Sequence, residues 1–201
     1  MSAMTPEPLR PRRGRPPSIT RERIAAIGIE MGLSDLTFVG VASRLGVSHK
    51  ALYKHVPSIE ALRVLVAEEM FGSWSLPPAD EETLEAYLLR FSQSLRDLVR
   101  SHPGLAWFLV RQKATTPAMM AKIYAHHEAV SSKYEISLDN ARWLLSTIAL
   151  HCIALADTVF AIVREEGGVP DQSEPSALEI DFELGMRALI IGVMVMLEGR
   201  R

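Results

Sequence analysis

The chain contains little cysteine, few aromatic residues and no long uninterrupted apolar run. Cys152 is the single cysteine among 201 residues, which excludes an internal disulfide and is typical of a reducing compartment. Its apolar neighbours predict a buried small side chain rather than a redox sensor. The longest apolar run, residues 188–197, has ten residues, about half of what a bilayer requires. We therefore expect no membrane span.

Sequence motifs of secreted proteins, enzymes and metal sites are missing as well. The first residues are rich in proline and arginine and lack the apolar segment of a signal peptide, so we expect a cytoplasmic protein. There is no P-loop, no Gly-x-Ser-x-Gly and no Glu-x-x-His pair, so we expect no enzyme and no cofactor. His126, His127 and Glu128 are adjacent, and neighbours on a helix point about 100° apart, so we expect no shared metal ion.

No segment shows the strict alternation of apolar and polar residues that predicts a β-strand. Apolar residues instead recur three or four positions apart, and glycine or proline separates the segments. The sequence therefore predicts an all-α chain of about nine helices. We expect these helices over residues 20–31, 37–45, 48–56, 58–71, 84–101, 104–113, 117–133, 139–166 and 177–199.

Charge is distributed unevenly along the chain. The net charge is −2, yet residues 1–60 hold nine Lys and Arg against five Asp and Glu. Residues 1–17 contain five prolines and four arginines and are predicted to be a disordered basic arm. Residues 72–80, with two adjacent prolines, form a connector between a head (residues 18–71) and a body (residues 80–201). A basic N-terminal part, residues 1–60, followed by an acidic remainder is the distribution expected where one end of a protein approaches DNA.

Residues 37–56 have the pattern of two short helices joined by a tight turn. Thr37 and Ser48 are suited to cap the two helices, Gly46 is suited to the turn between them, and Pro57 ends the second helix. The apolar positions expected to face inward are Val41, Leu45, Val47 and Leu52. The outward positions are polar or aromatic, which suits phosphates and base edges; they are His49, Lys50, Tyr53, Lys54 and His55. This pattern predicts a helix-turn-helix, whose second helix enters the DNA major groove.

The same stretch resembles the N-terminal domain of the tetracycline-repressor (TetR) family of transcriptional regulators. The matching positions are Thr37, Val41, Ala42, Leu45, Gly46, Val47, Ser48, Leu52, Tyr53, His55 and Val56. The last helix, with Phe182, Gly185 and Gly192, is similar to the end of the family's C-terminal domain. The resemblance implies a helical effector-binding and dimerisation domain, and a homodimer formed through the last two helices. The small residues and the broad apolar surface of the last helix favour the same interface.

Double-stranded DNA carrying a palindromic operator is the partner that the resemblance implies. The candidate DNA-binding residues are Arg12, Arg13, Arg15, Thr37, Ser48, His49, Lys50, Tyr53, Lys54 and His55. Residues 13–17 resemble an AT-hook, which enters a narrow minor groove, although a solvated basic tail remains the alternative. Ile59 stands where the family often carries lysine, and Val39 and Gly40 replace polar residues. We therefore expect greater dependence on the arm.

The body is expected to hold a pocket for a small-molecule effector, because the resemblance implies one. Aromatic, Met and His side chains are suited to line it, and each of them could equally be ordinary core. The candidates are His102, Trp107, Phe108, Met119, Met120, Trp143, His151 and Asp157. Asp157 interrupts an apolar helix, and it either pairs with an arginine or histidine or faces the pocket.

The sequence thus predicts a homodimeric DNA-binding transcriptional regulator, and the resemblance implies a repressor released by its effector. Two alternatives from other classes remain. One is an AT-hook architectural protein without an effector, which would bind A·T-rich DNA without a palindrome. The other is a helical small-molecule carrier, which would bind a ligand and no operator.

Overall fold

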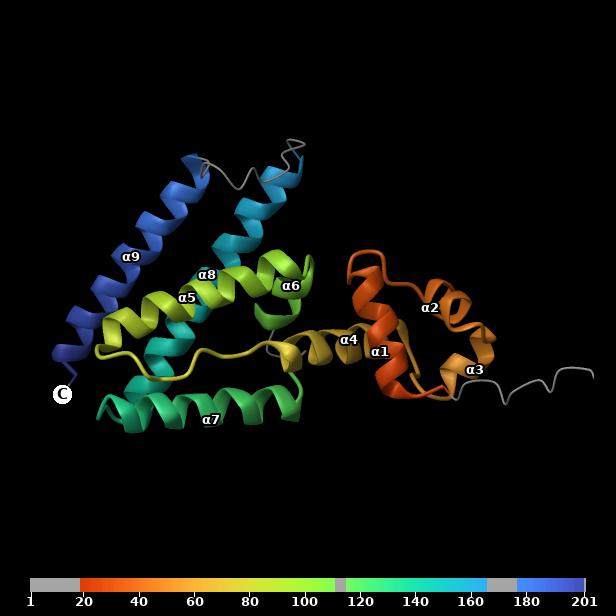
Figure 1. Cartoon of the computed structure of the whole chain (residues 1–201), viewed down its shortest axis with the longest axis horizontal. Helices are drawn as coiled ribbons and strands as arrows, with labels where there is room; N and C mark the ends of the chain where they lie inside the picture. Colours follow the sequence, from red (N-terminus) through yellow and green to blue (C-terminus); the bar gives the residue numbers. More distant parts are fainter. Residues whose placement is uncertain (1–18, 111–114, 166–176, 201) are drawn as a thin grey trace, which may run out of the picture.

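The computed structural model describes residues 19–110, 115–165 and 177–200, where the chain forms nine α-helices and no β-strand. This confirms the predicted all-α architecture. The helices are α1 (Arg21–Met31), α2 (Phe38–Leu45), α3 (His49–Tyr53), α4 (Ile59–Ser73), α5 (Leu84–Ser101), α6 (Leu105–Val110), α7 (Pro117–Lys133), α8 (Leu138–Glu165) and α9 (Ala177–Glu198). Figure 1 shows α1–α3 at one end of the molecule and α5–α9 at the other, with α4 between them. The basic arm, residues 1–17, lies outside the described residues.

Threonine and serine side chains begin most of the helices. In each case the side-chain oxygen accepts a hydrogen bond from the backbone N–H three residues further on, which satisfies one of the N–H groups left unpaired in the first turn. The capping residues are Thr20, Thr37, Ser48, Ser58, Thr83 and Thr116. The helix starts predicted at the first four of these residues are confirmed.

α3 is shorter than predicted. The backbone N–H of Lys54 donates to the Ala51 carbonyl, and that of His55 donates to the Leu52 carbonyl, so the chain tightens into three-residue turns. The helix therefore ends at Tyr53 rather than next to Pro57. Helix ends often tighten in this way, and proline marks only the outer limit of a helix.

The apolar core consists of two clusters. One cluster is built in the head, with fully buried side chains such as Ile24, Val41 and Leu62. It also includes four buried side chains from α5, α6 and α7, which are Leu98, Leu105, Phe108 and Met119. The head core is therefore continuous with one end of the body, although residues 74–83 join α4 to α5 without helical structure.

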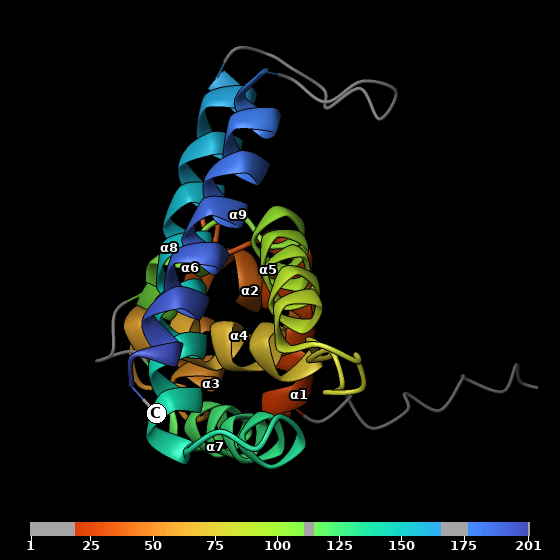
Figure 2. The same ribbon diagram turned by 90° about the vertical axis from the view of Figure 1, so that its left-hand side faces the viewer.

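The second cluster forms the body and is centred on α8, which packs against α5, α6, α7 and α9. Figure 2 shows α8 and α9 side by side, with α5 next to them. Cys152 is buried in this cluster, and its thiol donates a hydrogen bond to the Ser92 carbonyl at 3.2 Å. Burial raises the pKa of the Cys152 thiol to about 12. The prediction of a buried small side chain is confirmed.

α8 also carries enough apolar residues, between Leu138 and Val163, to cross a membrane by length and composition. The helix itself was predicted, but counting uninterrupted apolar runs did not identify it as a candidate membrane span, because single polar residues such as His151 divide it. The core helix of a helical bundle has the same composition, and the contacts of α8 with four other helices account for it here.

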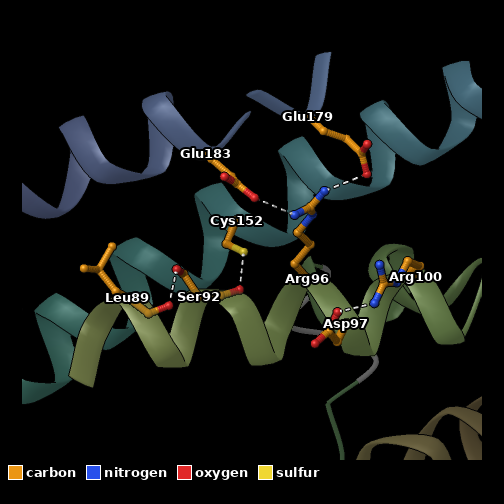
Figure 3. Close-up of polar contacts among 8 residues, drawn as sticks. All are labelled: Leu89, Ser92, Arg96, Asp97, Arg100, Cys152, Glu179 and Glu183. Atoms are coloured by element: carbon orange, nitrogen blue, oxygen red, sulfur yellow. Dashed lines mark hydrogen bonds and ion pairs between the residues drawn. The ribbon is translucent and has the colours of Figure 1, made fainter. Parts of the chain in front are cut away.

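An arginine joins α9 to α5. Arg96 of α5 donates to Glu179 at 2.8 Å and to Glu183 at 3.2 Å, both on α9 (Figure 3). Its guanidinium also lies 5.1 Å from the ring centroid of Phe182. The Arg96 side chain is 15% exposed, so solvent screens these ion pairs less than the surface pair between Asp97 and Arg100 in the same view.

Candidate nucleic-acid interface and ligand cavity

The turn between α2 and α3 has the geometry of a helix-turn-helix. Gly46 has φ 68° and ψ 31°, a left-handed conformation that costs glycine little and lets α2 stop abruptly. Two residues later Ser48 begins α3, and its Oγ accepts a hydrogen bond from the Ala51 N–H at 3.2 Å. Thr37 caps α2 in the same way, accepting from the Gly40 N–H at 3.0 Å. The two helices are thus fixed by local hydrogen bonds.

Three rings hold α3 against α2. Phe38 of α2 stacks on Tyr53 with a centroid distance of 4.5 Å, and His49 meets both rings edge-on at 5.3 and 4.9 Å. Such contacts add about 0.5–1.5 kcal/mol per pair beyond burial. His49 and Tyr53 are exposed, as predicted, but the contacts with Phe38 that restrict their orientation were not predicted.

The outer face of α3 is cationic. Lys50 and Lys54 are exposed, and His55 is half-buried where α3 ends. Val39 on neighbouring α2 is 70% exposed. Lysines can bind phosphates, and an exposed aliphatic group can contact the thymine methyl in the major groove. The face therefore combines charges for the DNA backbone with an apolar group for base edges.

Two departures from the family pattern have structural reasons. A Cβ on Gly40 would lie 2.5 Å from Cε of Met31 and 2.9 Å from Oγ1 of Thr37, so glycine makes room for α1 beside the cap. Ile59, where the family often has lysine, is half-buried and packs against the head core. At both positions tight packing against the head, rather than DNA, accounts for the residue.

A cavity of about 380 Å³ lies in the body, between the end of α4 and helices α5, α7 and α8. This volume is within the usual range for small-molecule sites. Its lining is mostly apolar and includes Phe71, Trp74, Phe91, Leu95, Ile123 and Leu145. Its polar lining residues are Thr115, Tyr124, His126, His127, Arg142 and Ser146.

Of the eight side chains predicted to line an effector pocket, Met120 alone lines this cavity. Phe108 and Met119 are instead buried in the head core, where α6 and α7 meet α4. Trp143 is half-buried beneath the guanidinium of Arg200, 4.5 Å from its ring centroid. Residue type alone does not reveal which side of a helix faces a cavity, and for these three the prediction does not fit this cavity.

The other four candidates also lie away from the cavity. Trp107 and His151 are exposed, and the His151 Nδ1 is 2.7 Å from the Thr147 carbonyl one turn earlier. His102 ends α5 and borders a separate depression beside Trp74. Asp157 is half-buried on α8 and does not line this cavity, which leaves the ion-pair alternative as a prediction.

Sequence reasoning missed the two histidines of α7 as cavity residues. Their adjacency argued against a shared metal ion, and among the described residues no group of three or more His, Cys, Asp or Glu could hold one. The Nε2 atom of His126 is 2.9 Å from the hydroxyl of fully buried Tyr87. Burial, and next the neighbouring His127, lower the pKa of His126 to about 4, so the ring that shares this hydrogen bond is neutral.

His127 has an unusual environment. Its side chain is 6% exposed, yet its buried Nδ1 has no hydrogen-bond partner. Burial, and next the charge of Arg142, hold the pKa of His127 below its ordinary value. This Nδ1 is buried rather than open to the cavity, and an unsatisfied buried polar atom costs about 1–3 kcal/mol.

A lysine joins the cavity wall to the end of α4. Lys122 of α7 donates to the carbonyls of Phe71 and Gly72, at 3.2 and 2.7 Å, and to that of Trp74. These carbonyls belong to the end of α4, where helical partners run out and a positive charge is favoured. Phe71 and Trp74 also line the cavity, so the ligand site and the helix that leads to the head share residues.

Exposed apolar side chains are concentrated on α8 and α9 of the body. Of the thirteen exposed large apolar residues in the described part of the chain, eight lie on α8 and α9. They are Leu150, Leu155, Leu178, Ile180, Leu184, Ile191, Val195 and Met196. A Cβ on Gly185 or Gly192 would meet open space, so both glycines are on the surface of α9. An exposed surface of this kind indicates a protein interface.

Comparison with known proteins locates the fold. No protein-family model matches the chain, and no curated protein sequence matches it. Among solved structures, a variant TetR from Acinetobacter baumannii AYE in complex with minocycline superposes with a TM-score of 0.72 at 20% identity, over 90% of this chain and 99% of that one. The Streptomyces coelicolor TetR family protein ActR in complex with actinorhodin superposes with a TM-score of 0.72 at 21% identity, over 89% of this chain and 96% of that one. The S. coelicolor regulator SCO7222 superposes with a TM-score of 0.62 at 18% identity, over 88% of this chain and 98% of that one. The chain therefore has the all-α fold of the TetR-family transcriptional regulators.

Proposed function

We propose that the protein is a homodimeric transcriptional regulator that binds a palindromic DNA operator and is released from it by a small molecule. The exposed cationic face of α3, fixed to α2 by capping and ring stacking, is the observation that carries this proposal. The ten DNA-binding candidates named from the sequence remain its expected contacts. A repressing rather than activating role follows the family resemblance.

The dimer is proposed to form through α8 and α9. The eight exposed apolar side chains there would be buried against a second copy, and the surface glycines would allow the helices to approach closely. A twofold dimer would present two α3 helices about one duplex turn apart, which matches a palindromic site.

The effector is proposed to bind in the 380 Å³ cavity. Several similar structures contain small molecules, minocycline in the A. baumannii TetR and actinorhodin in ActR. Here the cavity shares Phe71 and Trp74 with the end of α4, which packs against α1 in the head. A ligand that fits one position of α4 better than another would change the spacing of the heads, because coupling requires different affinities for the two states.

Fluorescence anisotropy with the duplex upstream of the protein's own gene tests the proposal. We expect nanomolar binding to one palindromic site, at least about 10³-fold tighter than to scrambled DNA. Weak binding that follows A·T content and collapses with salt would support the architectural alternative. Ligand binding without any operator would support a carrier.

Lys50→Ala locates the interface within this experiment. We expect operator affinity to fall about tenfold, because one cationic contact at the start of α3 is lost. Lys133→Ala, at an exposed lysine at the end of α7, is the matched control and should bind as the wild type does. Equal affinities for the two variants would place the DNA elsewhere.

A further inference from the structure

We propose that the cavity in the body selects an apolar aromatic molecule that carries a negative charge, with Arg142 as its counter-ion. This inference rests on the proposed role of the cavity as the effector site and names the chemical class of that effector. Three features of the described lining support it: the buried rings, a charged side chain at the edge with no carboxylate beside it in the lining, and the polar side chains near that charge.

The buried part of the lining is apolar and rich in rings. Phe71 and Phe91 are 4% exposed, Leu95 is 2% exposed and Leu145 is 1% exposed. The indole of Trp74 is fixed by a hydrogen bond from its Nε1 to Ser94 Oγ at 2.7 Å. Rings held at these positions favour a flat aromatic molecule, which gains both burial and ring stacking.

The charge lies on the side of the cavity that faces solvent. Arg142 of α8 lines the cavity with a side chain 48% exposed, and its guanidinium is 5.6 Å from the ring centroid of Tyr124. Its ion-pair partner Asp139 is 3.7 Å away and 89% exposed, so that pair is weak. Among the described lining residues Arg142 alone carries a permanent charge, and none is a carboxylate.

This arrangement discriminates between ligands by charge. An anionic group beside Arg142 would gain a charge-assisted hydrogen bond and would replace only a weak surface pair. A cationic ligand would meet no described carboxylate in the lining and would be repelled by the guanidinium. A neutral ligand would gain only the apolar contacts.

Tyr124 supplies a second polar contact. Its ring lies beside that of His127, with centroids 6.4 Å apart, and both residues line the cavity together with Arg142. A phenol hydroxyl can donate or accept, so it can bond a polar atom of the ligand. The polar atoms of the ligand are therefore expected near Tyr124, His127 and Arg142, and its rings near α4 and α5.

Two fluorescent probes with almost the same rings test the charge. Anilinonaphthalene sulfonate carries one negative charge, and N-phenylnaphthylamine lacks the sulfonate. Both are titrated into the full-length wild type and into Arg142→Gln, with folding checked by circular dichroism. We expect the wild type to bind the sulfonate about tenfold more tightly than the neutral probe, and Arg142→Gln to lose this preference while its affinity for the neutral probe stays the same.

Two further variants make the result specific. Arg100→Gln is the matched control, because Arg100 also pairs with an aspartate three residues earlier and is similarly exposed, at 52%. It should bind both probes as the wild type does. Ser146→Trp places a large ring at an exposed position of the cavity lining, and both probes should bind it weakly.

The other outcomes overturn either the inference or the proposed function, and they can be told apart. Equal affinities of the wild type for the two probes would show a site for neutral ligands and would leave the proposed regulator standing. Binding unaffected by Ser146→Trp, or no binding of either probe, would also refute an anion-selective cavity. Preference for the sulfonate that depends on Arg142, in a protein that binds no operator, would refute the regulator but not the ligand class.

Discussion

The head and the body differ in which apolar and polar side chains they bury and which they expose. In the head, α1–α4 bury their apolar side chains around one core, and the exposed face of α3 is cationic. In the body, the largest helices leave eight large apolar side chains exposed, and a nearly buried histidine has no hydrogen-bond partner. The core of the head is therefore closed, in part by side chains from α5, α6 and α7, whereas the body has surfaces that suit a second copy and a ligand.

The difference shows where partners act. An exposed charge in the head is already well solvated, so DNA adds contacts without changing the fold. An exposed apolar face and an unsatisfied imidazole are unfavourable in the single chain, so binding partners stabilise the body itself. Four substitutions test this comparison, in order of decreasing effect.

Leu184→Glu should have the largest effect, because it places a charge on the exposed face of α9, where the side chain is 62% exposed. We expect a monomer by sedimentation and at least about a 100-fold loss of operator affinity, since two half-sites are no longer bound together. Val39→Glu, at an equally exposed aliphatic residue of the head, should remain dimeric. A dimeric Leu184→Glu would remove α9 from the interface.

Lys122→Met should destabilise the junction between the two regions. The three carbonyls at the end of α4 lose a charged donor, so we expect the free energy of unfolding in urea to fall by about 2 kcal/mol. Lys133→Met, on the same helix but exposed, should change it by less than about 0.5 kcal/mol. Similar losses in both variants would contradict a capping role.

The buried histidine His126 should make the stability of the body depend on pH. Its pKa is about 4 in the folded chain against 6.5 for the free group, so the unfolded chain binds more protons between these values. This contribution is complete above pH 6.5 and is lost as the pH falls towards 4. When the pH falls from 7 to 5, the free energy of unfolding should fall by about 1 kcal/mol less in His126→Gln than in the wild type, allowing for partial exposure of the ring.

Urea unfolding at the two pH values measures this effect. His151→Gln is the control at an exposed ring, and it should keep the pH dependence of the wild type. If His126→Gln unfolds with the wild-type pH dependence as well, burial does not hold the His126 ring neutral.

His127→Phe should have the smallest effect and the opposite sign. It keeps a ring but removes the unpaired Nδ1, so we expect the ligand-free protein to gain about 0.5–1 kcal/mol of stability. His126→Phe, one residue earlier, loses the hydrogen bond with Tyr87 and should be destabilised. Destabilisation of both variants would mean that His127 has a structural role.

Much of the fold followed from local signals in the sequence. The caps at Thr37 and Ser48 and the turn at Gly46 act within four residues, so the helix starts and the helix-turn-helix were predictable. α3 ended early because hydrogen bonds at Lys54 and His55 tightened it, a detail that Pro57 does not encode. The exposed apolar face of α9 was also foreseen, from the breadth of its apolar surface.

The cavity was not predictable in the same way. Its walls come from residues 71–153, and which side of each helix faces inward depends on how the helices cross. Phe108 and Met119 have suitable chemistry but face α4, whereas Arg142 and Tyr124 were passed over and line the cavity. The adjacent histidines of α7 were the one sequence signal that pointed to the cavity, and in the sequence they suggested only a metal site.

The sequence by itself determined the helices, the turn that joins α2 to α3, and the separation of a basic N-terminal part, residues 1–60, from an acidic remainder. These depend on capping, glycine conformation and composition, which act between near neighbours in the chain. Tertiary structure alone decided that Phe38 holds His49 and Tyr53, that Lys122 caps α4, and that His127 lacks a partner beside Arg142. Each of these contacts joins different helices, or leaves an atom unpaired among them, so it exists only once the helices have packed.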